Sequence, residues 1–259
     1  MTQPGLQTDH TQRISEAAVR AGLGRHVQTY GAVTMDWRGI GRLGMIFVGL
    51  VAVTVLGFAV RVELLEAAMY FALIVGLAAL FSIVHGLFYG QRNSGKWLEL
   101  FEHGLIFVSR EQLRVVRYDS TSVIQDLVDH RRNGVTTRVT YAYEMQDLDG
   151  RPLRLREGIV NPQEWGPRIQ EGVAVHQMPT VLATLGSGQA VEFGSITLSP
   201  AGVTGYSTLV QWAEITDVDI AEGRLRIKTA AKHPSIAVPI SSLTNFNLLY
   251  ALIKRGRGL

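Results

Sequence analysis

The sequence contains no cysteine, and that absence excludes several kinds of site at once. Disulfides, thiolate zinc centres and cysteine nucleophiles all require the residue. The seven histidines show neither a His-x-x-x-His nor a His-Glu-x-x-His spacing, so the sequence gives no support for a metal site. It also has no Gly-x-Ser-x-Gly elbow and no phosphate-binding loop. We therefore expect no metal, no cofactor and no catalytic residues.

Charge is also scarce and nearly balanced. Charged residues make up 18% of the chain, and the formal net charge is +3. From residue 91 onward there are 19 Lys and Arg against 17 Asp and Glu, a balance of +2 spread over a long segment. Nucleic-acid binding requires a concentrated basic face, so we expect no nucleic-acid partner.

Two long apolar runs are the strongest feature that the sequence does contain. Residues 44–60 hold no charged side chain, and residues 67–90 hold only His85 among the ionisable Asp, Glu, Lys, Arg and His set. As helices they would measure about 26 Å and about 35 Å, against a hydrocarbon core of about 30 Å. With the short linker 61–66 they predict a transmembrane helical hairpin over residues 44–90. The alternative is a buried helical pair in a soluble core.

Basic residues near the two runs predict the orientation. Arg38 and Arg42 precede the first span, and Arg92 and Lys96 follow the second. The positive-inside rule then predicts a multi-pass protein of the cell membrane with both termini in the cytoplasm. Residues 1–43 would form a cytoplasmic segment that is disordered over 1–12 and carries a short helix over 15–22. His85 is expected to be a neutral, hydrogen-bonded residue rather than a proton relay.

Small residues in the second run predict close helix packing. Ala68, Ala72 and Gly76 recur every four residues, and Gly86 and Gly90 form a Gly-x-x-x-Gly pair. The expected partner is the first span of the same chain, with homodimerisation as the second choice.

After residue 96 the pattern changes from helical to alternating. Residues 138–145 alternate apolar and polar side chains, and the dipeptides Asn133-Gly134 and Asp149-Gly150 predict flanking hairpin turns. Further short strands are expected over 98–101, 105–109, 113–118 and 122–129. A helical region over 161–185, broken at Pro167 and Pro179, closes a first unit that spans residues 91–187.

A second unit over residues 188–259 repeats this layout in shorter form. Strands are expected over 190–193, 196–199, 207–212, 215–220, 225–228 and 236–240, followed by a helix over 245–255. A turn is expected at 200–202. Tyr118 and Trp212 occupy equivalent places, because each ends a strand and precedes a β-branched residue by six positions. The layout is that of an internal repeat.

The second unit resembles bacterial pleckstrin-homology-like (PH-like) domains. The resemblance is carried by the runs 195–202, 212–215, 222–227 and 236–241, and the first unit, through 101–105 and Tyr118-Asp119, is similar to a divergent copy. The chain as a whole resembles uncharacterised actinobacterial membrane proteins that have two spans and such domains. The implied fold class is a membrane α-helical hairpin with an α+β, mainly β cytoplasmic region of tandem PH-like meanders. The matching motifs are structural and bring no catalytic residues.

Two groups of arginines are candidate binding residues. Arg110, Arg114 and Arg117 fall in the first meander, and Arg131, Arg132 and Arg138 flank the Asn133-Gly134 turn. Near an anionic leaflet each basic residue could contribute about 1 kcal/mol. Our preferred interpretation is that they are solvated partners, across strands, of Asp119, Asp126, Asp129 and Glu144.

The sequence thus favours a non-enzymatic membrane protein that presents PH-like domains to an unknown protein partner at the inner membrane face. A sensor of anionic lipid headgroups is the alternative. An enzyme with dispersed catalytic residues is a third hypothesis.

Overall fold

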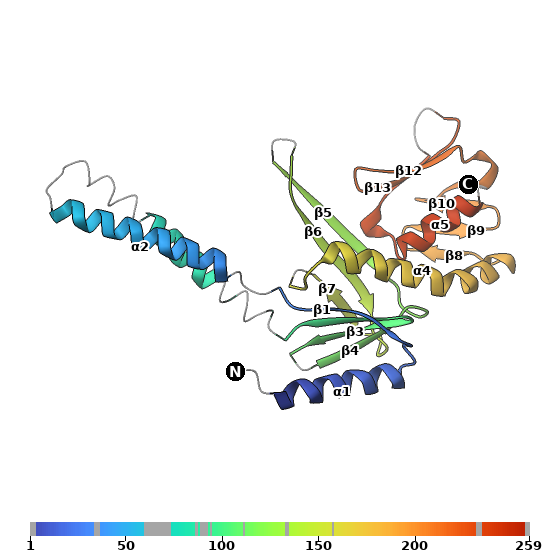
Figure 1. Cartoon of the computed structure of the whole chain (residues 1–259). Helices are drawn as coiled ribbons and strands as arrows, with labels where there is room; N and C mark the ends of the chain where they lie inside the picture. The colour runs from blue at the N-terminus through green and yellow to red at the C-terminus, as the bar shows by residue number, and fades with distance from the viewer. Residues whose placement is uncertain are drawn as a thin grey trace. The chain divides into compact units, whose positions relative to one another are not determined.

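The computed structural model shows an α+β protein built from several small antiparallel sheets (Figure 1). It describes residues 4–33, 37–59, 74–85, 88, 93, 95–110, 112–132, 135–156, 158–231 and 235–256, with some of their side chains left out. The chain forms two compact units. Residues 1–31 and 96–259 make up one, and residues 32–95 make up the other.

The first half of the larger unit is a four-stranded sheet followed by a three-stranded one. The four-stranded sheet runs in the order β1 (His26–Tyr30), β2 (Trp97–Phe101), β3 (Gly104–Ser109) and β4 (Gln112–Arg117). The second sheet consists of β5 (Ile124–Arg132), β6 (Val135–Gln146) and β7 (Pro152–Leu155). Every pairing in both sheets is antiparallel, and helix α4 (Pro162–Gly186) follows.

The second half repeats this order. Its four-stranded sheet holds β8 (Val191–Phe193), β9 (Ile196–Ser199), β10 (Gly202–Gly205) and β11 (Thr208–Gln211). Its three-stranded sheet holds β12 (Asp217–Ala221), β13 (Arg224–Lys228) and β14 (Ile236–Pro239), and helix α5 (Phe246–Gly256) follows. Tyr118 directly follows β4 and Trp212 directly follows β11, so the equivalence predicted for these two aromatics is confirmed.

Helix α4 packs against the cores of both halves. Trp165, Ile169 and Val173 are fully buried in the first core, where Trp165 meets Tyr143 edge-on at 5.2 Å between ring centroids. The C-terminal part of the helix packs against the second core through Ala174, Met178, Val181, Leu182 and Leu185. A helix with two buried faces has no single apolar stripe, which is why its sequence shows no clear amphipathic period.

The expected breaks at Pro167 and Pro179 are wrong, because α4 is continuous through both prolines. Each proline removes one backbone donor and strains the preceding turn, at a cost of about 3 kcal/mol in an ordinary helix interior. Burial against two cores offsets that cost. Two glycines of α4 allow the helix to lie close to the first core. A Cβ on Gly166 would lie 2.2 Å from the Tyr143 hydroxyl, and a Cβ on Gly172 would lie 2.6 Å from the Tyr118 ring.

A polar network joins the two halves beside this helix. Asn245, which precedes α5, accepts a hydrogen bond from the backbone N–H of Val123 (2.7 Å) and donates one to Gln177 of α4 (2.8 Å). Gln177 in turn donates to the carbonyls of Tyr118 (2.7 Å) and Thr121 (2.6 Å). Asn245 is buried and has a positive φ of 48°, a conformation that asparagine tolerates better than most residues.

The N-terminal region differs from its expected description. Helix α1 extends over Pro4–Arg20, so the disorder expected for residues 1–12 is wrong over residues 4–12. Its Ala18, and Leu23 beyond it, are buried against Phe101, Ile106 and Val108 on one face of the β1–β4 sheet. Docking onto this apolar face supports the helix where its own sequence gives little signal.

Strand β1 was not among the strands expected from the sequence. It pairs antiparallel with β2, with Tyr30 opposite Leu98, so the smaller unit is inserted between two hydrogen-bonded neighbours. Residues 1–31 therefore belong to the same compact unit as the sheets, whereas the first unit predicted from the sequence began at residue 91. Only one side chain of β1, Tyr30, is buried, which leaves a weak local pattern for a strand.

The hairpin turns agree in part with their predictions. Arg132 pairs with Val135, as a two-residue turn at 133–134 requires, although these two residues lie outside the described part. The second turn is longer than the expected tight type, and in it only Gly150 has a positive φ, of 73°. In the second half, Gly202 begins β10 where only a turn was expected.

The smaller unit contains helix α2 (Trp37–Ala59) and a helical stretch over residues 74–85. Gly76 lies against Phe47 of α2, since a Cβ there would come within 2.2 Å of the Phe47 ring, and the close packing expected at Gly76 is made within the chain. Ala68, Ala72, Gly86 and Gly90 lie outside the described residues. In the part of the chain that is described, no helix has both the length and the apolar character needed to cross a bilayer.

Removal of the Asn245 side chain should destabilise the larger unit. Asn245→Ala leaves the buried N–H of Val123 without its acceptor and places alanine at a positive φ, so we expect a loss of about 2–4 kcal/mol in the free energy of unfolding. Asn245→Gly loses the same hydrogen bonds but accepts the backbone conformation, and should lose about 1 kcal/mol less. Chemical unfolding of the full chain followed by tryptophan fluorescence measures both. Equal stability of the Ala and wild-type chains would contradict this role.

Candidate functional site

The structure does not gather Arg110, Arg114 and Arg117 into one binding surface. Arg110 lies in the turn after β3 with a φ of 49°, and its side chain is exposed. Arg114 and Arg117 are three residues apart on β4, and side chains at that spacing point to opposite faces of a strand. A headgroup could not contact all three from one side.

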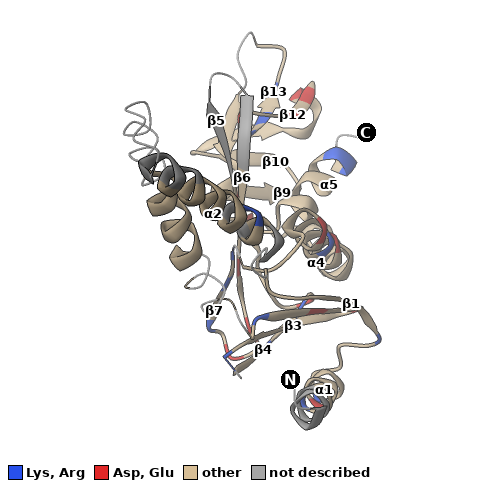
Figure 2. Ribbon diagram, turned by 60° about the vertical axis from the view of Figure 1, so that its left-hand side comes forward, with Lys and Arg blue, Asp and Glu red and all other residues tan. Residues whose placement is uncertain are grey.

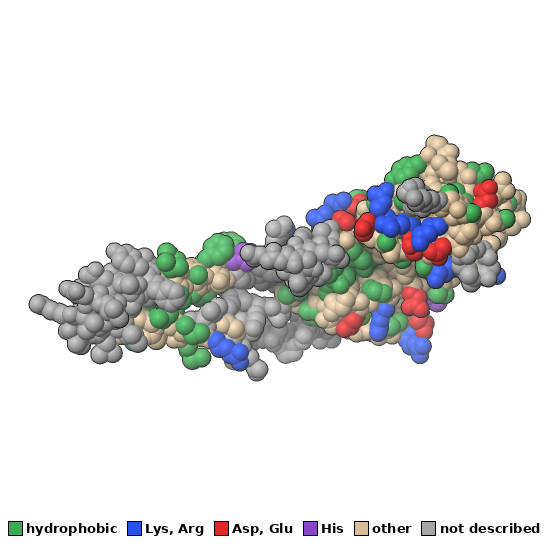
Figure 3. Space-filling view, turned by 90° about the horizontal axis from the view of Figure 1, so that it is seen from above, with side chains coloured by type: hydrophobic (Ala, Val, Ile, Leu, Met, Phe, Trp, Pro, Cys, Tyr) green, Lys and Arg blue, Asp and Glu red, His purple; other side chains and the backbone are tan. Residues whose placement is uncertain are grey.

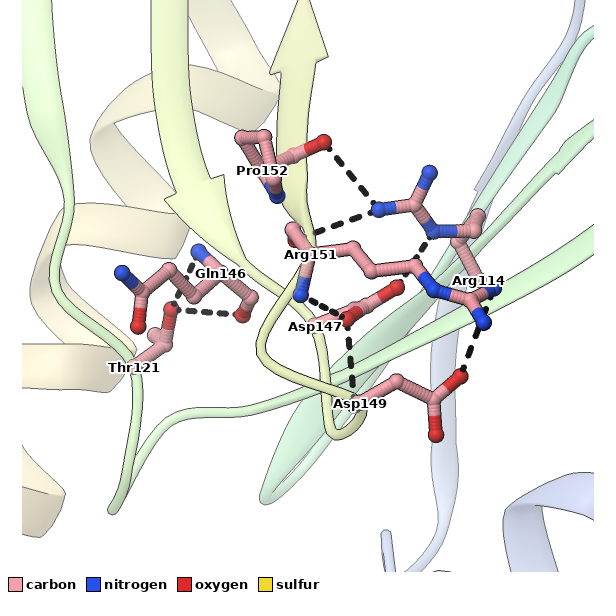
Figure 4. Close-up of polar contacts among 7 residues, drawn as sticks. All are labelled: Arg114, Thr121, Gln146, Asp147, Asp149, Arg151 and Pro152. Atoms are coloured by element: carbon pink, nitrogen blue, oxygen red, sulfur yellow. Dashed lines mark hydrogen bonds and ion pairs between the residues drawn. The ribbon is translucent and has the colours of Figure 1, made fainter.

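Arg114 fastens the β6–β7 turn to the edge of the first sheet (Figure 4). It forms an ion pair with Asp147 and donates hydrogen bonds to the carbonyls of Arg151 and Pro152, each at 3.1 Å. The backbone N–H of Leu148 also donates to the Val115 carbonyl of β4 at 2.9 Å. These contacts use the guanidinium of Arg114 within the fold.

Asp147 is the acceptor at the centre of this turn, and its side chain is only 3% exposed. Burial acts to raise its pKa, but hydrogen bonds from the backbone N–H of Arg151 and from Arg114, with the charge of Arg114, outweigh burial and lower the pKa. Its Oδ1 accepts from the N–H groups of Arg151 (2.8 Å) and Asp149 (3.0 Å). The ionised carboxylate therefore holds the turn together.

Arg117 is engaged in a similar way. It pairs with Asp119, to which its Nε donates at 3.0 Å, and its Nη1 donates to the Ala21 carbonyl at the end of α1 (2.8 Å). The hydrogen bond and charge of Arg117 lower the pKa of Asp119. Arg114 and Arg117 thus each pair with an acidic residue, but neither forms the cross-strand pair that the sequence favoured: Asp119 is only two residues from Arg117, and Asp147 was not among the expected partners.

Arg131, Arg132 and Arg138 occupy the far end of the β5–β6 hairpin, and their side chains lie outside the described part. The strand register is clear: Arg131 is opposite Thr136, and Arg138 is opposite His130. Asp126 is opposite Ala142 and Asp129 is opposite Val139. The cross-strand pairing of these acidic residues with arginine that the sequence favoured is therefore absent from the directly opposed positions.

The tip of the β10–β11 hairpin combines backbone strain with exposed apolar side chains. Gly205 pairs with Thr208, so Tyr206 and Ser207 form a two-residue turn, and both have a positive φ, of 48° and 69°. Such turns favour glycine and asparagine, and bulky residues there are uncommon. Tyr206 is 65% exposed, and Leu209 on the edge strand β11 is also exposed. Strain of this kind is frequent at functional positions.

Charges on the second half are arranged differently from those on the first. Between His176 and Arg224 the sequence has no basic residue but has five acidic ones: Glu192, Glu214, Asp217, Asp219 and Glu222. Lys228 pairs with Asp217 and Asp219, and α5 carries Lys254 and Arg255 in its last turn (Figure 2). In Figure 3, basic and acidic side chains intermingle over the larger unit, whereas hydrophobic side chains predominate on the described part of the smaller one.

A histidine pair forms where sequence spacing gave no signal. Nδ1 of His103, in the β2–β3 turn, lies 2.8 Å from Nε2 of His176 on α4, whose Nδ1 is 2.7 Å from the Gly172 carbonyl. The two residues are 73 positions apart, so only the fold could bring them together. Among the described residues, no group of three or more His, Asp or Glu side chains is placed to hold a metal ion.

Comparison with known proteins gives one match. A family model described as a family of unknown function (DUF6585) matches residues 7–258, nearly the whole chain. No curated protein and no solved structure matches.

The ionised Asp147 predicts a pH dependence of stability. Its folded pKa lies below the unfolded value of about 3.9, so its contribution is complete above that value and is lost as the pH falls through the folded pKa. Asp147→Asn should cost about 1–3 kcal/mol at pH 7, and the difference from wild type should shrink below about pH 4. Thermal unfolding of the full chain at pH 7, 5 and 3 measures this difference.

Asp149→Asn is the matched control in the same turn. Its pairing with Arg151 is long, at 4.0 Å, and exposed, so it should change stability by less than about 0.5 kcal/mol at any pH. A pH-independent gap between wild type and Asp147→Asn would mean that the carboxylate charge is not what holds the turn.

Proposed function

The chain belongs to the DUF6585 family, and on that premise we propose that it is a non-enzymatic, membrane-anchored interaction protein. The smaller unit anchors it as a multi-pass hairpin of the cell membrane, with both termini in the cytoplasm. The larger unit presents two PH-like domains to a protein partner at the inner membrane face. The observation that carries this proposal is the insertion of an apolar helical unit between two paired strands of an otherwise β-rich unit.

The PH-like assignment is supported by the repeated strand order. Each half consists of four antiparallel strands, then three, then one helix, and an aromatic residue follows the fourth strand in both. An antiparallel meander closed by one C-terminal helix is the layout that the sequence resemblance implies. The two halves are proposed to be tandem copies that share α4 as a common support.

Membrane anchoring is supported by the side chains of the smaller unit. The described helical residues that expose large apolar side chains include Met45, Ile46, Val48, Val55, Ile74, Leu77, Leu80, Phe81 and Phe88. Exposed apolar surface on this scale is costly in water and favourable in hydrocarbon. The proposed spans at residues 44–60 and 67–90 extend into residues 60–73, which lie outside the described part of the chain. Because Tyr30 and Leu98 are paired, both ends of the hairpin connect to one edge of one sheet.

The proposed protein-binding surface is the strained tip of β10–β11. Tyr206 offers a large apolar contact at small cost in side-chain entropy, and Leu209 extends it along the edge strand. The N–H of Gln211 on the same strand is already bonded to Glu214 at 3.1 Å, which limits strand addition beyond Leu209.

The lipid-sensor alternative is weaker on one specific ground. Arg114 and Arg117 each form an ion pair and donate to backbone carbonyls, so a headgroup would have to displace contacts within the fold. The exposed Arg110 and the β5–β6 arginines would remain for such a role.

Cysteine accessibility tests the anchoring, and the cysteine-free sequence makes it clean. Glu63→Cys lies in the proposed external linker and Ser187→Cys in the larger unit. In intact cells an impermeant maleimide should label Glu63→Cys and spare Ser187→Cys, and lysis should expose both. The membrane hairpin would be overturned if neither Glu63→Cys nor Ser187→Cys were labelled before lysis. It would also be overturned if alkaline carbonate released the protein from the membrane fraction.

Proximity labelling from the intact chain tests the partner surface. Deletion of residues 188–259 would remove Asn245 and leave Gln177 without its partner, so surface variants are the better probe. Tyr206→Ser with Leu209→Ser should reduce labelling of specific neighbours at least fivefold at equal protein level, whereas exposed Glu171→Gln on α4 should not change it. An unchanged profile would reject this tip as the binding surface.

A further inference from the structure

The β5–β6 hairpin extends beyond the sheet to which it belongs. Strand β7 pairs with β6 only over residues 143–146, opposite residues 152–155. On its outer side, β5 forms a bridge between Ile124 and Thr244, and beyond that bridge no described strand pairs with it. Residues 126–132 and the strand facing them are therefore a two-stranded arm, which is visible as the long ribbon in Figure 1. Two-stranded ribbons are marginally stable alone in water.

The apolar face of the core continues onto this arm. Tyr143 and Met145 of β6 are buried, and Val139, on the same face, is 37% exposed. Leu127, opposite Tyr141 in the register, is 47% exposed. Strands with an open edge and exposed apolar residues tend to recruit another strand.

Charges along β5 indicate which strand fits. Asp126 and Asp129 lie in the first part of the open segment, and Arg131 and Arg132 lie at its end. Inside the hairpin the two acidic residues face Ala142 and Val139. A segment that is acidic at one end and basic at the other is complementary to itself when two copies run antiparallel.

We propose that the arm is a homodimerisation site, in which β5 pairs antiparallel with β5 of a second copy of this chain. We place the twofold axis at Asp129, the middle of the open segment. Residues 126–132 of one copy then lie along residues 132–126 of the other. In that register Asp126 lies opposite the arginine at position 132 of the second copy, twice by symmetry. The two Asp129 residues face each other once, on the axis, and each also lies diagonal to an arginine at position 131 of the other copy. The pairing makes a four-stranded antiparallel layer from two marginal ribbons.

The dimer adds a partner that the proposed function does not include, and it does not depend on membrane anchoring. The occupant is argued from charge: an anionic lipid surface would use only the arginines of the arm, whereas a second copy uses both the acidic and the basic end of the strand. The tests below run on the full chain, and their outcome is independent of the maleimide experiment.

Single cysteines placed one at a time at residues 127 to 131 locate the axis. In a symmetric antiparallel pair only the residue on the axis faces its own copy, so the yield of disulfide dimer under mild oxidation should peak at Asp129→Cys. Two residues away it should fall about tenfold, because Cα separations beyond about 7 Å do not permit a disulfide. Ser187→Cys, exposed at the end of α4, is the control. A flat profile at the level of that control would overturn the proposal.

A charge-exchange cycle identifies the partner. With the cysteine at position 129 as reporter, Asp126→Lys and Arg132→Glu should each lower the dimer yield about tenfold, because each puts like charges opposite one another twice. The double variant restores opposite charges and should recover the yield. If the lipid surface is the true occupant, Asp126→Lys would instead increase binding to vesicles containing phosphatidylserine, and the double variant would not recover the dimer. That result would overturn the self-pairing.

Discussion

Helix α4 is the constraint on which the rest of the larger unit depends, because one helix packs against two cores. Its Trp165, Ile169 and Val173 side chains fill the first core, and residues from Ala174 to Leu185 pack against the second. In the second core α4 adds to the cover that the buried side chains of α5 provide. The network from Gln177 through Asn245 to Val123 then links the two halves. Its hydrogen bonds join the segment between β4 and β5, helix α4 and the residue before α5. The two halves are therefore better regarded as one cooperative structure than as two independent modules.

The smaller unit is inserted in the sequence between β1 and β2, two strands that pair with each other. Because Tyr30 pairs with Leu98, the chain leaves for the smaller unit and returns from it on two neighbouring strands. Helix α1 covers one face of the same sheet, and Arg117 ties its C-terminal end to β4.

Arginine shows how the same residue type takes different roles here. Arg114 and Arg117 serve as internal fasteners: their planar guanidinium groups satisfy a carboxylate and backbone carbonyls together, which a lysine could not reproduce with the same geometry. The arginines of β5 lie opposite threonine and valine in their own hairpin and are proposed to serve a second copy. The surfaces proposed for partners, at Tyr206 and along β5, both combine exposed apolar side chains with an edge strand.

The sequence by itself determined the local structure of much of this protein. Period-two alternation marked most of the strands, the glycine turns were placed at or near their positions, and two uninterrupted apolar runs predicted helical structure in residues 44–59 and 74–85, because these signals come from neighbouring residues. Tertiary structure decided what local signals do not encode: the pairing of β1 with β2 across the inserted unit, the continuity of α4 through two prolines, and the capture of Arg114 by Asp147. In each case the residues that stabilise the conformation lie far away in sequence. Their contacts form only when the chain folds, so a local sequence pattern cannot show them.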